Sequence, residues 1–331
     1  MQLRRSLLRS LLVALLVPAG CRRTDEPPKV VMKVAQVLPE SHPTTMAMAF
    51  FKRRAEELAG PGLEVRLYPS GQIGATNNAI ELCRLGNVEA AVVSTAPLSS
   101  YVPEITALTM PFVFRDGAHQ AAVFDGPAAG LIDEVLARRG LAAGTFFDAG
   151  TRNIMTKRGP VRSRDDLAGL KIRVMNSAPL QQAVERLGAA AIPMNQAEVY
   201  GALQTGMIDG WENNPATCLA FSMHETGCIH FSWTRHVAIP DVLLLSRRWI
   251  EGLDPAMRDA ILRAAAETGD HQRRLWQEKE TEAIATLKEN GMQFHEVDST
   301  AFRSAFDGFY QPYRDRYGPE FSELLDLILS Q

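Results

Sequence analysis

Strand-like and helix-like segments alternate along this chain in two successive rounds, and this order limits the possible folds more than any other feature. The first round contains a helical segment from Ser41 towards Gly60 and the strand-like "LEVRLYPSGQIG" at 63–74. The pattern restarts at residue 163 with "SRDDLAGLKIRVM", followed by a helical segment behind Ser177. Strands that alternate with helices predict a mainly parallel α/β sheet, and the restart predicts two such units.

One short pattern occurs once in each round. "IELCRLGNVEAA" and "YGALQTGMIDGW" align on Gly86 and Gly206, which places Glu89 on Asp209. Both segments predict a helix that stops at glycine and is followed by a strand. A pattern shared by the two halves indicates two units of related build.

The segment from 254 to 291 has a strongly helix-favouring composition. Asp254 is a suitable cap, Pro255 suits a first helical turn, and Gly291 closes the segment. We expect one long helix that braces the two units, with Gly269 as a possible bend; two ordinary helices broken near Gly269 are the alternative.

The N-terminal residues are typical of an export signal. "MQLRRSLLRS" supplies three arginines, and the apolar "LLVALLVPAG" that follows is short for a membrane span. We predict a signal peptide at 1–21, lipidation of Cys21 as in bacterial lipoproteins, and a polar tether at 22–28. The alternative is cleavage nearby and soluble release. Either outcome predicts a periplasmic protein.

Charge and motifs exclude several classes of protein. The formal net charge of −3 provides no long-range attraction for nucleic acid or an anionic membrane. The chain lacks a nucleotide-binding glycine loop, G-x-S-x-G, H-E-x-x-H and paired C-x-x-C motifs, so we expect neither an enzyme nor a cofactor.

Cysteine and histidine side chains near 218–230 raise two further questions. His224, Cys228 and His230 resemble a soft-metal set, but a solvated loop with a buried cysteine explains them better, and we expect no metal. Cys218 and Cys228 form the closest pair for a disulfide in an exported chain; we favour buried thiols.

Four polar residues follow or interrupt predicted strands. Arg152 lies where a strand resumes after Gly150, Arg173 interrupts an apolar strand, and Asn213 and Asn214 follow a third strand. In α/β sheets ligands bind outside the carboxyl ends of strands, so these side chains are expected to converge on one cleft. Arginine forks and amides together suit a small organic anion.

Several motifs in order resemble a known family. They are "SGQIGATNNAIELCRLG", "LTMPFVFRD", "RNIMTKRGPVRSRDDLAGLKIRV" and "ALQTGMIDGWENNP". Together they resemble the solute-binding proteins of tripartite ATP-independent periplasmic (TRAP) transporters, over about residues 29–331. The resemblance implies an α/β, two-lobe, Venus-flytrap binding protein with discontinuous domains and a long bridging helix. It places one lobe at 29–150 with 240–278 and the other at 151–239 with 279–331.

The resemblance also implies the ligand, the partner and the site. Such proteins deliver an organic acid to an ion-gradient-driven membrane permease, without enzymatic activity. The family's carboxylate-binding arginine corresponds to Arg173, its second arginine to Arg152 and its ligand-binding asparagine to Asn213. Where many members carry an acidic pair, this chain has Asn77 and Asn78. We further expect the following residues near the ligand: Glu40, His42, Trp211, Glu212, His236 and Asp241.

The "ENNP" form resembles the members that take sugar acids such as uronates and aldonates, and dicarboxylates or keto acids are the next candidates. Three other functions stay open at this point. They are an exported enzyme that uses the carboxylates of Asp209 and Glu212 on a sugar acid, a binding protein that presents its ligand to a receptor, and a structural lipoprotein.

Overall fold

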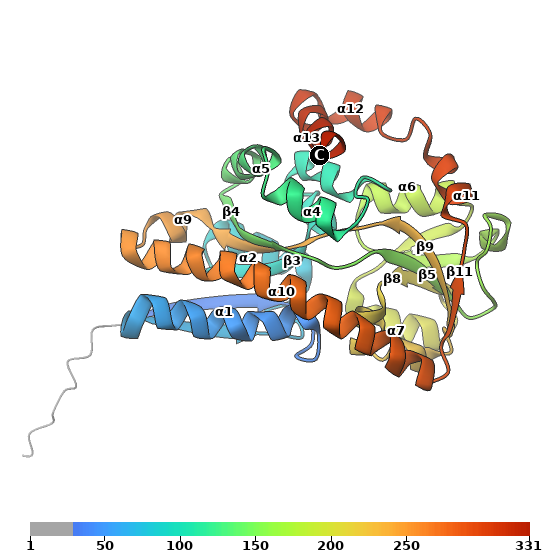
Figure 1. The fold of residues 1–331 in the computed structure, drawn as a ribbon, viewed down its shortest axis with the longest axis horizontal. Coiled ribbons are helices and arrows are strands. Elements are labelled where there is room, and N and C mark those ends of the chain that lie inside the picture. The colour runs from blue at the N-terminus through green and yellow to red at the C-terminus, as the bar shows by residue number, and fades with distance from the viewer. Residues whose placement is uncertain (1–28) are drawn as a thin grey trace, which may run out of the picture.

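Two β-sheets organise residues 29–331, the part of the chain that this computed structural model describes (Figure 1). The strands are β1 (Val30–Gln36), β2 (Leu63–Tyr68), β3 (Ala90–Ser94), β4 (Leu141–Phe147), β5 (Arg152–Thr156), β6 (Lys171–Val174), β7 (Ala190–Pro193), β8 (Gly210–Asn213), β9 (His230–Val237), β10 (Asp241–Ser246) and β11 (Gln293–Glu296). The first sheet has the order β2-β1-β3-β10-β4, and the second has the order β11-β9-β5-β8-β6-β7. The two rounds of the sequence therefore form two separate sheets.

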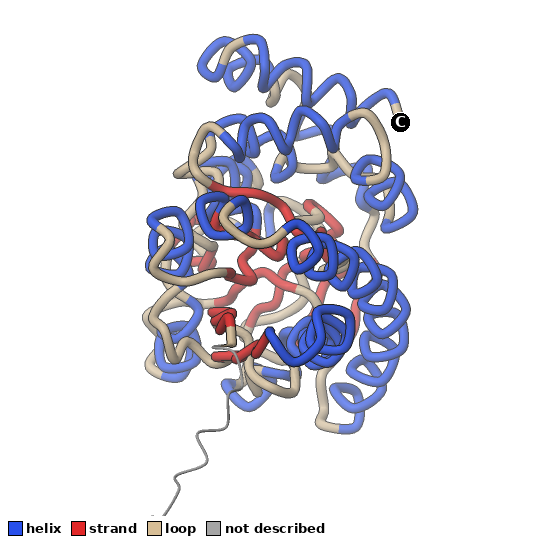
Figure 2. Tube along the Cα trace, turned by 90° about the vertical axis from the view of Figure 1, so that its left-hand side faces the viewer, coloured by secondary structure: helices blue, strands red, loops and turns tan. Residues whose placement is uncertain are grey.

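Helices surround both sheets, and the strands lie in the interior (Figure 2). The α-helices are α1 (Pro43–Ala59), α2 (Thr76–Leu85), α3 (Thr95–Leu98), α4 (Gly117–Phe124), α5 (Ala128–Ala137), α6 (Ala178–Arg186), α7 (Gln196–Gln204), α8 (Pro215–Ala220), α9 (Arg247–Glu251), α10 (Pro255–Glu289), α11 (Ser299–Arg303), α12 (Gln311–Tyr317) and α13 (Pro319–Ser330). Short 3₁₀ segments are η1 (Gly60–Gly62), η2 (Pro103–Thr109), η3 (Asp165–Leu167), η4 (Met223–Thr226) and η5 (Ser304–Phe306). No helix of residues 29–331 is long and apolar enough to cross a membrane.

The sheets are mixed, so the prediction of mainly parallel sheets needs correction. β1 is parallel to β2 and β3, and β6 is parallel to β7 and β8. β10 is antiparallel to β3 and β4, and β5 is antiparallel to β8 and β9. The antiparallel strands are those joined by short crossings between the sheets, where no helix intervenes to return the chain in the same direction.

The repeated helix, glycine and strand pattern has the same structure in both units. α2 and α7 each lead to a glycine with positive φ, Gly86 at 77° and Gly206 at 72°, before β3 and β8. The acid that follows accepts a hydrogen bond from a backbone N–H of the neighbouring strand region: Glu89 from Lys33 N at 2.8 Å, and Asp209 from Lys171 N at 2.9 Å. The matching contacts support the interpretation that the two units are related in build.

Helix α10 is continuous over 35 residues, which excludes the alternative of two helices broken near Gly269. It contacts α1 and β4 of the first unit and α8 of the second (Figure 1). A Cβ atom at Gly269 would lie 2.4 Å from Thr145 Oγ1 on β4. Glycine at this position therefore permits close packing of the helix on the sheet rather than a bend.

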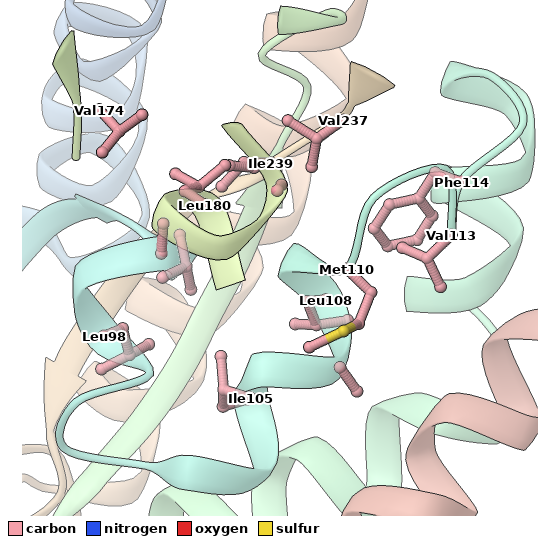
Figure 3. Close-up of a cluster of buried hydrophobic side chains, with 14 of the residues drawn as sticks. Leu98, Ile105, Leu108, Met110, Val113, Phe114, Val174, Leu180, Val237 and Ile239 are labelled. Atoms are coloured by element: carbon pink, nitrogen blue, oxygen red, sulfur yellow. The ribbon is translucent and has the colours of Figure 1, made fainter. Parts of the chain in front are cut away.

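One apolar cluster extends through both units. It contains Ala91 and Val93 from β3, Val174 from β6, Leu180 from α6 and residues of the C-terminal helices. Figure 3 shows part of it, with side chains from η2, α6 and the crossing between β9 and β10. The units thus share a continuous apolar core on this side of the molecule.

The C-terminal segment departs from the expected division at 279–331. β11 pairs with β9 of the second sheet, as expected, but α13 packs against η2 and α5 of the first unit. His119 Nε2 lies 2.9 Å from Ile328 O, and Arg138 Nη2 lies 2.6 Å from Glu320 Oε2. Apolar residues such as Leu324 and Ile328 explain this packing, because burying them requires a second apolar surface.

Three further predictions have different outcomes: one is corrected, one is confirmed and one falls outside the described residues. Helix α1 begins at Pro43 rather than at Ser41, and its cap is His42, whose ring accepts a hydrogen bond from Thr44 N. Cys83, Cys218 and Cys228 are free and buried, as favoured from the sequence. The predicted signal peptide, Cys21 lipidation and tether lie outside the described residues.

Candidate ligand-binding site

A cavity of about 370 Å³ opens between the two units. Its lining residues belong to the segments 37–42, 70–77, 92–97, 149–152, 173–176, 194–197, 213–221 and 239–241. Six of these segments lie at the carboxyl ends of the parallel strands β1, β2, β3, β6, β7 and β8. The cavity therefore occupies the place where α/β sheets bind ligands.

Arg173 contributes the charge that most defines the cavity. Its side chain lies on β6 and is 2% exposed. The guanidinium donates to Met194 O from Nε at 3.0 Å and from Nη2 at 2.7 Å, and to Gln196 Oε1 from Nη1 at 3.2 Å. All of these acceptors are neutral, so the side chain is held in position while its charge has no carboxylate partner among the described residues.

Burial lowers the pKa of Arg173 to about 10, in spite of the nearby Glu212 charge, and this value still leaves the side chain charged at neutral pH. A buried cation that hydrogen bonds only to neutral groups is costly in free energy until an anion reaches it.

Arg152 also lines the cavity, but its charge is compensated. Its Nε and Nη2 atoms donate to the two carboxylate oxygens of Glu212, and Nη2 also donates to Glu212 O at 2.7 Å. Burial alone would raise the pKa of Glu212, but the Arg152 charge and hydrogen bonds hold it at about 2. The pair is therefore fully ionised, and its net charge is zero.

Asn213 lines the cavity beside Arg152. Its side-chain oxygen accepts from Arg152 Nη1 at 3.1 Å and from Asn214 N at 2.9 Å. Its amide N–H₂ donates to no other residue among 29–331 and is available as a donor. Asn214 instead caps α8 by accepting from Thr217 N at 2.7 Å and donates to Ala149 O. Of the two asparagines, Asn214 therefore has a structural role that Asn213 lacks.

His42 joins the two units at the cavity wall. Its Nδ1 accepts from Thr44 N at 3.2 Å, and its Nε2 lies 3.1 Å from Thr217 Oγ1. Burial lowers the pKa of His42 to about 3, so the ring is neutral and its Nε2 carries the proton that it donates to Thr217. Trp276 of α10 packs behind it, with ring centroids 5.8 Å apart.

Asp241 supplies a carboxyl group to the cavity. The residue is 9% exposed and begins β10. Burial raises the pKa of its carboxyl to about 7, against the lowering effect of the Arg152 charge. No hydrogen bond to its carboxylate occurs among residues 29–331, so this group is also available to a ligand.

The sequence model of the bacterial extracellular solute-binding proteins of family 7 matches residues 34–316. The chain belongs to this family. Membership confirms the resemblance to TRAP solute-binding proteins and makes the chain an extracytoplasmic binding protein of a transport system rather than an enzyme.

Solved TRAP solute-binding proteins have the same fold. One from Sulfitobacter sp. NAS-14.1, with bound β-D-galacturonate, is 29% identical and has a TM-score of 0.88 over 91% of this chain and 100% of its own. One from Citrobacter koseri, with bound D-glucuronate, is 33% identical and has a TM-score of 0.83 over 90% and 98%. A solute-binding protein of Chromohalobacter salexigens is 31% identical, over 88% of this chain and 85% of its own. The two-lobe α/β fold is thereby confirmed.

In this family 7 protein the cavity gathers six of the ten residues predicted for the site. They are His42, Asn77, Arg152, Arg173, Asn213 and Asp241. Glu212 and His236 lie behind the wall, where His236 Nε2 is 3.7 Å from Glu212 Oε2 and both are fully buried. They support Arg152 and do not line the cavity.

Two predicted residues, Glu40 and Trp211, do not line the cavity. Glu40 is exposed and is absent from the lining, because the segment turns His42 and not Glu40 inward. Trp211 is fully buried in the apolar cluster that contains Leu203 and Phe231. A large apolar ring gains more free energy in this core than at a wet cavity wall.

Sequence reasoning missed several polar lining residues of the TRAP protein. Asn176 follows β6, and Asn195 and Gln196 follow β7. The rule that found Asn213, polar side chains at carboxyl ends of strands, also applies to "AAIPMNQ" after β7. Among the described residues no three His, Cys, Asp or Glu side chains gather to hold a metal ion.

Proposed function

We propose that this protein captures a sugar acid, such as a uronate or an aldonate, and delivers it to an ion-gradient-driven TRAP permease in the membrane. Dicarboxylates and keto acids are the next candidates. The single observation that carries the proposal is the guanidinium of Arg173, which lines the cavity and hydrogen bonds only to neutral acceptors. A ligand carboxylate provides the missing anion with two parallel hydrogen bonds.

The rest of the cavity suits hydroxyl groups. Amide side chains of Asn77, Asn176, Gln196 and Asn213 line it, and amides both donate to and accept from hydroxyls. The volume of about 370 Å³ is within the range of small-molecule pockets. Family members of this fold have been solved with bound galacturonate and glucuronate, which supports a six-carbon sugar acid here.

Binding is proposed to couple to closure of two lobes. We assign residues 29–150 and 240–278 to one lobe and 151–239 and 279–298 to the other, with the C-terminal helices on the first. The carboxylate docks on Arg173 in the second lobe, and the first lobe then closes over the hydroxyls. Closure removes water and strengthens the ion pair, and it is favoured only by contacts that the open state lacks.

The location and the membrane partner follow from the family. We propose that the mature protein resides in the periplasm, anchored by a lipid on Cys21, and meets the permease subunits there. Intact-mass measurement of the exported protein tests the anchor, because a diacylated Cys21 adds a large and defined mass. Uptake by vesicles that contain the permease subunits separates transport from a sensory role, since a sensor would not stimulate uptake.

Thermal unfolding of residues 29–331 with a panel of uronates, aldonates, dicarboxylates and 2-keto acids tests the proposed ligand. A ligand at a hundred times its dissociation constant adds about 2.7 kcal/mol to the free energy of unfolding. We expect sugar acids to raise the melting temperature, and the shift to disappear in Arg173→Ala. The exposed Arg162 lies outside the cavity lining, so Arg162→Ala is the matched control. A shift that persists in Arg173→Ala contradicts the proposed anchor.

A further inference from the structure

The charged groups that line the cavity do not cancel evenly. Arg152 is neutralised by Glu212, with which it forms a buried ion pair. His42 is neutral because burial lowers its pKa to about 3. The cavity therefore presents one uncompensated cation, Arg173, and one uncompensated carboxyl group, Asp241. The cation has a function in the proposed binding of a carboxylate, whereas the carboxyl group has none yet.

Asp241 is fixed in place by its backbone and not by its side chain. As the first residue of β10 it pairs with Ser94 of β3 on one side and with Phe147 of β4 on the other. Both neighbours are uncharged. The side chain is nine-tenths buried, lines the cavity and accepts no hydrogen bond from any described residue. The Arg152 charge lowers the pKa of Asp241, but Arg152 donates its hydrogen bonds to Glu212 and Asn213 and not to Asp241.

A buried polar group without a partner costs free energy, and a carboxyl group costs more than most. Asparagine at this position would avoid the cost of burying a charge in the empty protein. The carboxyl group is therefore expected to be useful when the cavity is filled. As an acceptor it can take hydrogen bonds from two ligand hydroxyls, and as an anion it repels a second ligand carboxylate.

We propose that Asp241 selects polyhydroxy monocarboxylates and rejects dicarboxylates, by accepting hydrogen bonds from ligand hydroxyls in the cavity. This inference rests on the proposed function, because it takes the first carboxylate to be held by Arg173. It assigns the choice between two acid classes to one side chain. A site that discriminates in this way uses a repulsive element as well as attractive ones.

The test compares six-carbon acids that differ in the number of carboxylates. Calorimetry at about pH 8, where the carboxyl is ionised, measures the affinities of galacturonate and galactarate, and of glucuronate and glucarate. The readout is the affinity ratio of uronate to aldarate in the wild type divided by the same ratio in Asp241→Asn. Ligand shape affects both proteins equally and cancels from this quotient.

We expect the quotient to be roughly tenfold or more, since like-charge juxtaposition costs several kcal/mol and each 1.4 kcal/mol is a factor of about ten. Part of the change should come from tighter aldarate binding by Asp241→Asn. Glu40→Gln is the matched control, because it also removes one negative charge close to the cavity but from a side chain that does not line it. Its quotient should stay near one.

The outcomes separate the two proposals. If the wild type binds uronates and the quotient is near one, or if Glu40→Gln changes it as much, Asp241 does not select the acid class, and the proposed function stands. If aldarates bind neither protein measurably while uronates bind both, removing the charge has no benefit and the inference is likewise overturned. If no organic acid binds the wild type, the proposed function fails and the inference fails with it.

Discussion

Arg152 donates through two nitrogen atoms to both carboxylate oxygens of Glu212, across the antiparallel pair β5 and β8. Arg173, on the adjacent strand β6, has only neutral acceptors. Two buried arginines of one sheet thus differ in whether the protein itself supplies the anion. Arg152 forms an ion pair within the wall of the cavity, whereas Arg173 lines the same cavity without an ion-pair partner among the described residues.

Removing one partner of the buried pair is expected to destabilise the protein. Glu212→Ala leaves the guanidinium of Arg152 buried without compensation, and we expect a loss of about 3–5 kcal/mol in the free energy of unfolding. Urea denaturation measures it. The exposed pair Arg84 and Glu81 is the control, since Glu81→Ala should change stability by less than about 1 kcal/mol. Equal losses in the two variants would contradict the assignment of Glu212 to the wall.

The shape of the Arg173 side chain should matter as well as its charge. Arg173→Lys keeps a cation in the cavity but loses the planar fork that meets a carboxylate with two hydrogen bonds. We expect the affinity for the bound acid to fall by roughly 1–2 kcal/mol, less than the about 2–5 kcal/mol lost in Arg173→Ala. Calorimetry with the same acid ranks the three proteins. An affinity of Arg173→Lys equal to that of the wild type would exclude bidentate docking.

Asp241 should reduce the stability of the empty protein above neutral pH. Burial raises the pKa of its carboxyl from 3.8 to about 7 in the folded state, against the lowering effect of the Arg152 charge. Between pH 3.8 and pH 7 the folded protein therefore keeps a proton on Asp241 that the unfolded chain has lost. Stability from this group is therefore greatest at low pH and is lost as the pH rises towards 7. We expect Asp241→Asn to gain roughly 1–3 kcal/mol at about pH 8 and much less at about pH 4. Denaturant curves at the two pH values, without ligand, check the sign.

His42 has the opposite pH dependence. Burial lowers its pKa from 6.5 to about 3, so the unfolded chain takes up a proton that the folded protein excludes. The contribution of His42 to the free energy of unfolding is complete above pH 6.5 and is lost as the pH falls towards 3. We expect His42→Asn, which keeps an acceptor for the cap of α1, to show a flatter decline of stability across this range. A decline identical to that of the wild type would mean that His42 does not titrate on unfolding.

Sequence reasoning found Arg173, because a charge inside an apolar strand requires an explanation whatever the fold. It found Asn213 from the position of polar residues at a strand end. It misplaced Trp211, which adjoins the site in sequence but packs with Leu203 and Phe231 in space. Neighbours along a strand meet different surroundings, and only the tertiary packing decides which of them face the cavity.

The ion pair between Arg152 and Glu212 could not be predicted from the sequence for the same reason. Its partner Glu212 lies sixty positions away, and the pairing depends on the register of β5 with β8. The C-terminal helices illustrate a second limit. The sequence predicts their apolar faces, but no local sequence pattern predicts that α13 packs against η2 and α5. Long-range pairing sets both features, whereas helix ends such as Gly86 are set locally.

Gly269 provides a final test of how the long helix packs. An added Cβ would lie 2.4 Å from Thr145 Oγ1, so in Gly269→Ala the Thr145 side chain, the helix or the strand has to shift, and we expect a cost of about 1–3 kcal/mol. Gly130 in α5 is exposed with no atom within 4 Å of an added Cβ, and Gly130→Ala should instead stabilise by about 0.5–1 kcal/mol through helix propensity.

The double variant Gly269→Ala with Thr145→Ala separates packing from other causes of instability. Removing the Thr145 hydroxyl relieves the contact, so the two changes together should cost less than the sum of each alone, as denaturant curves of the four proteins would show. Strict additivity would mean that Gly269 is required for some reason other than close approach to β4. Coupling between the two positions would instead establish that the long helix is held directly against the first sheet, as an element that bridges both units must be.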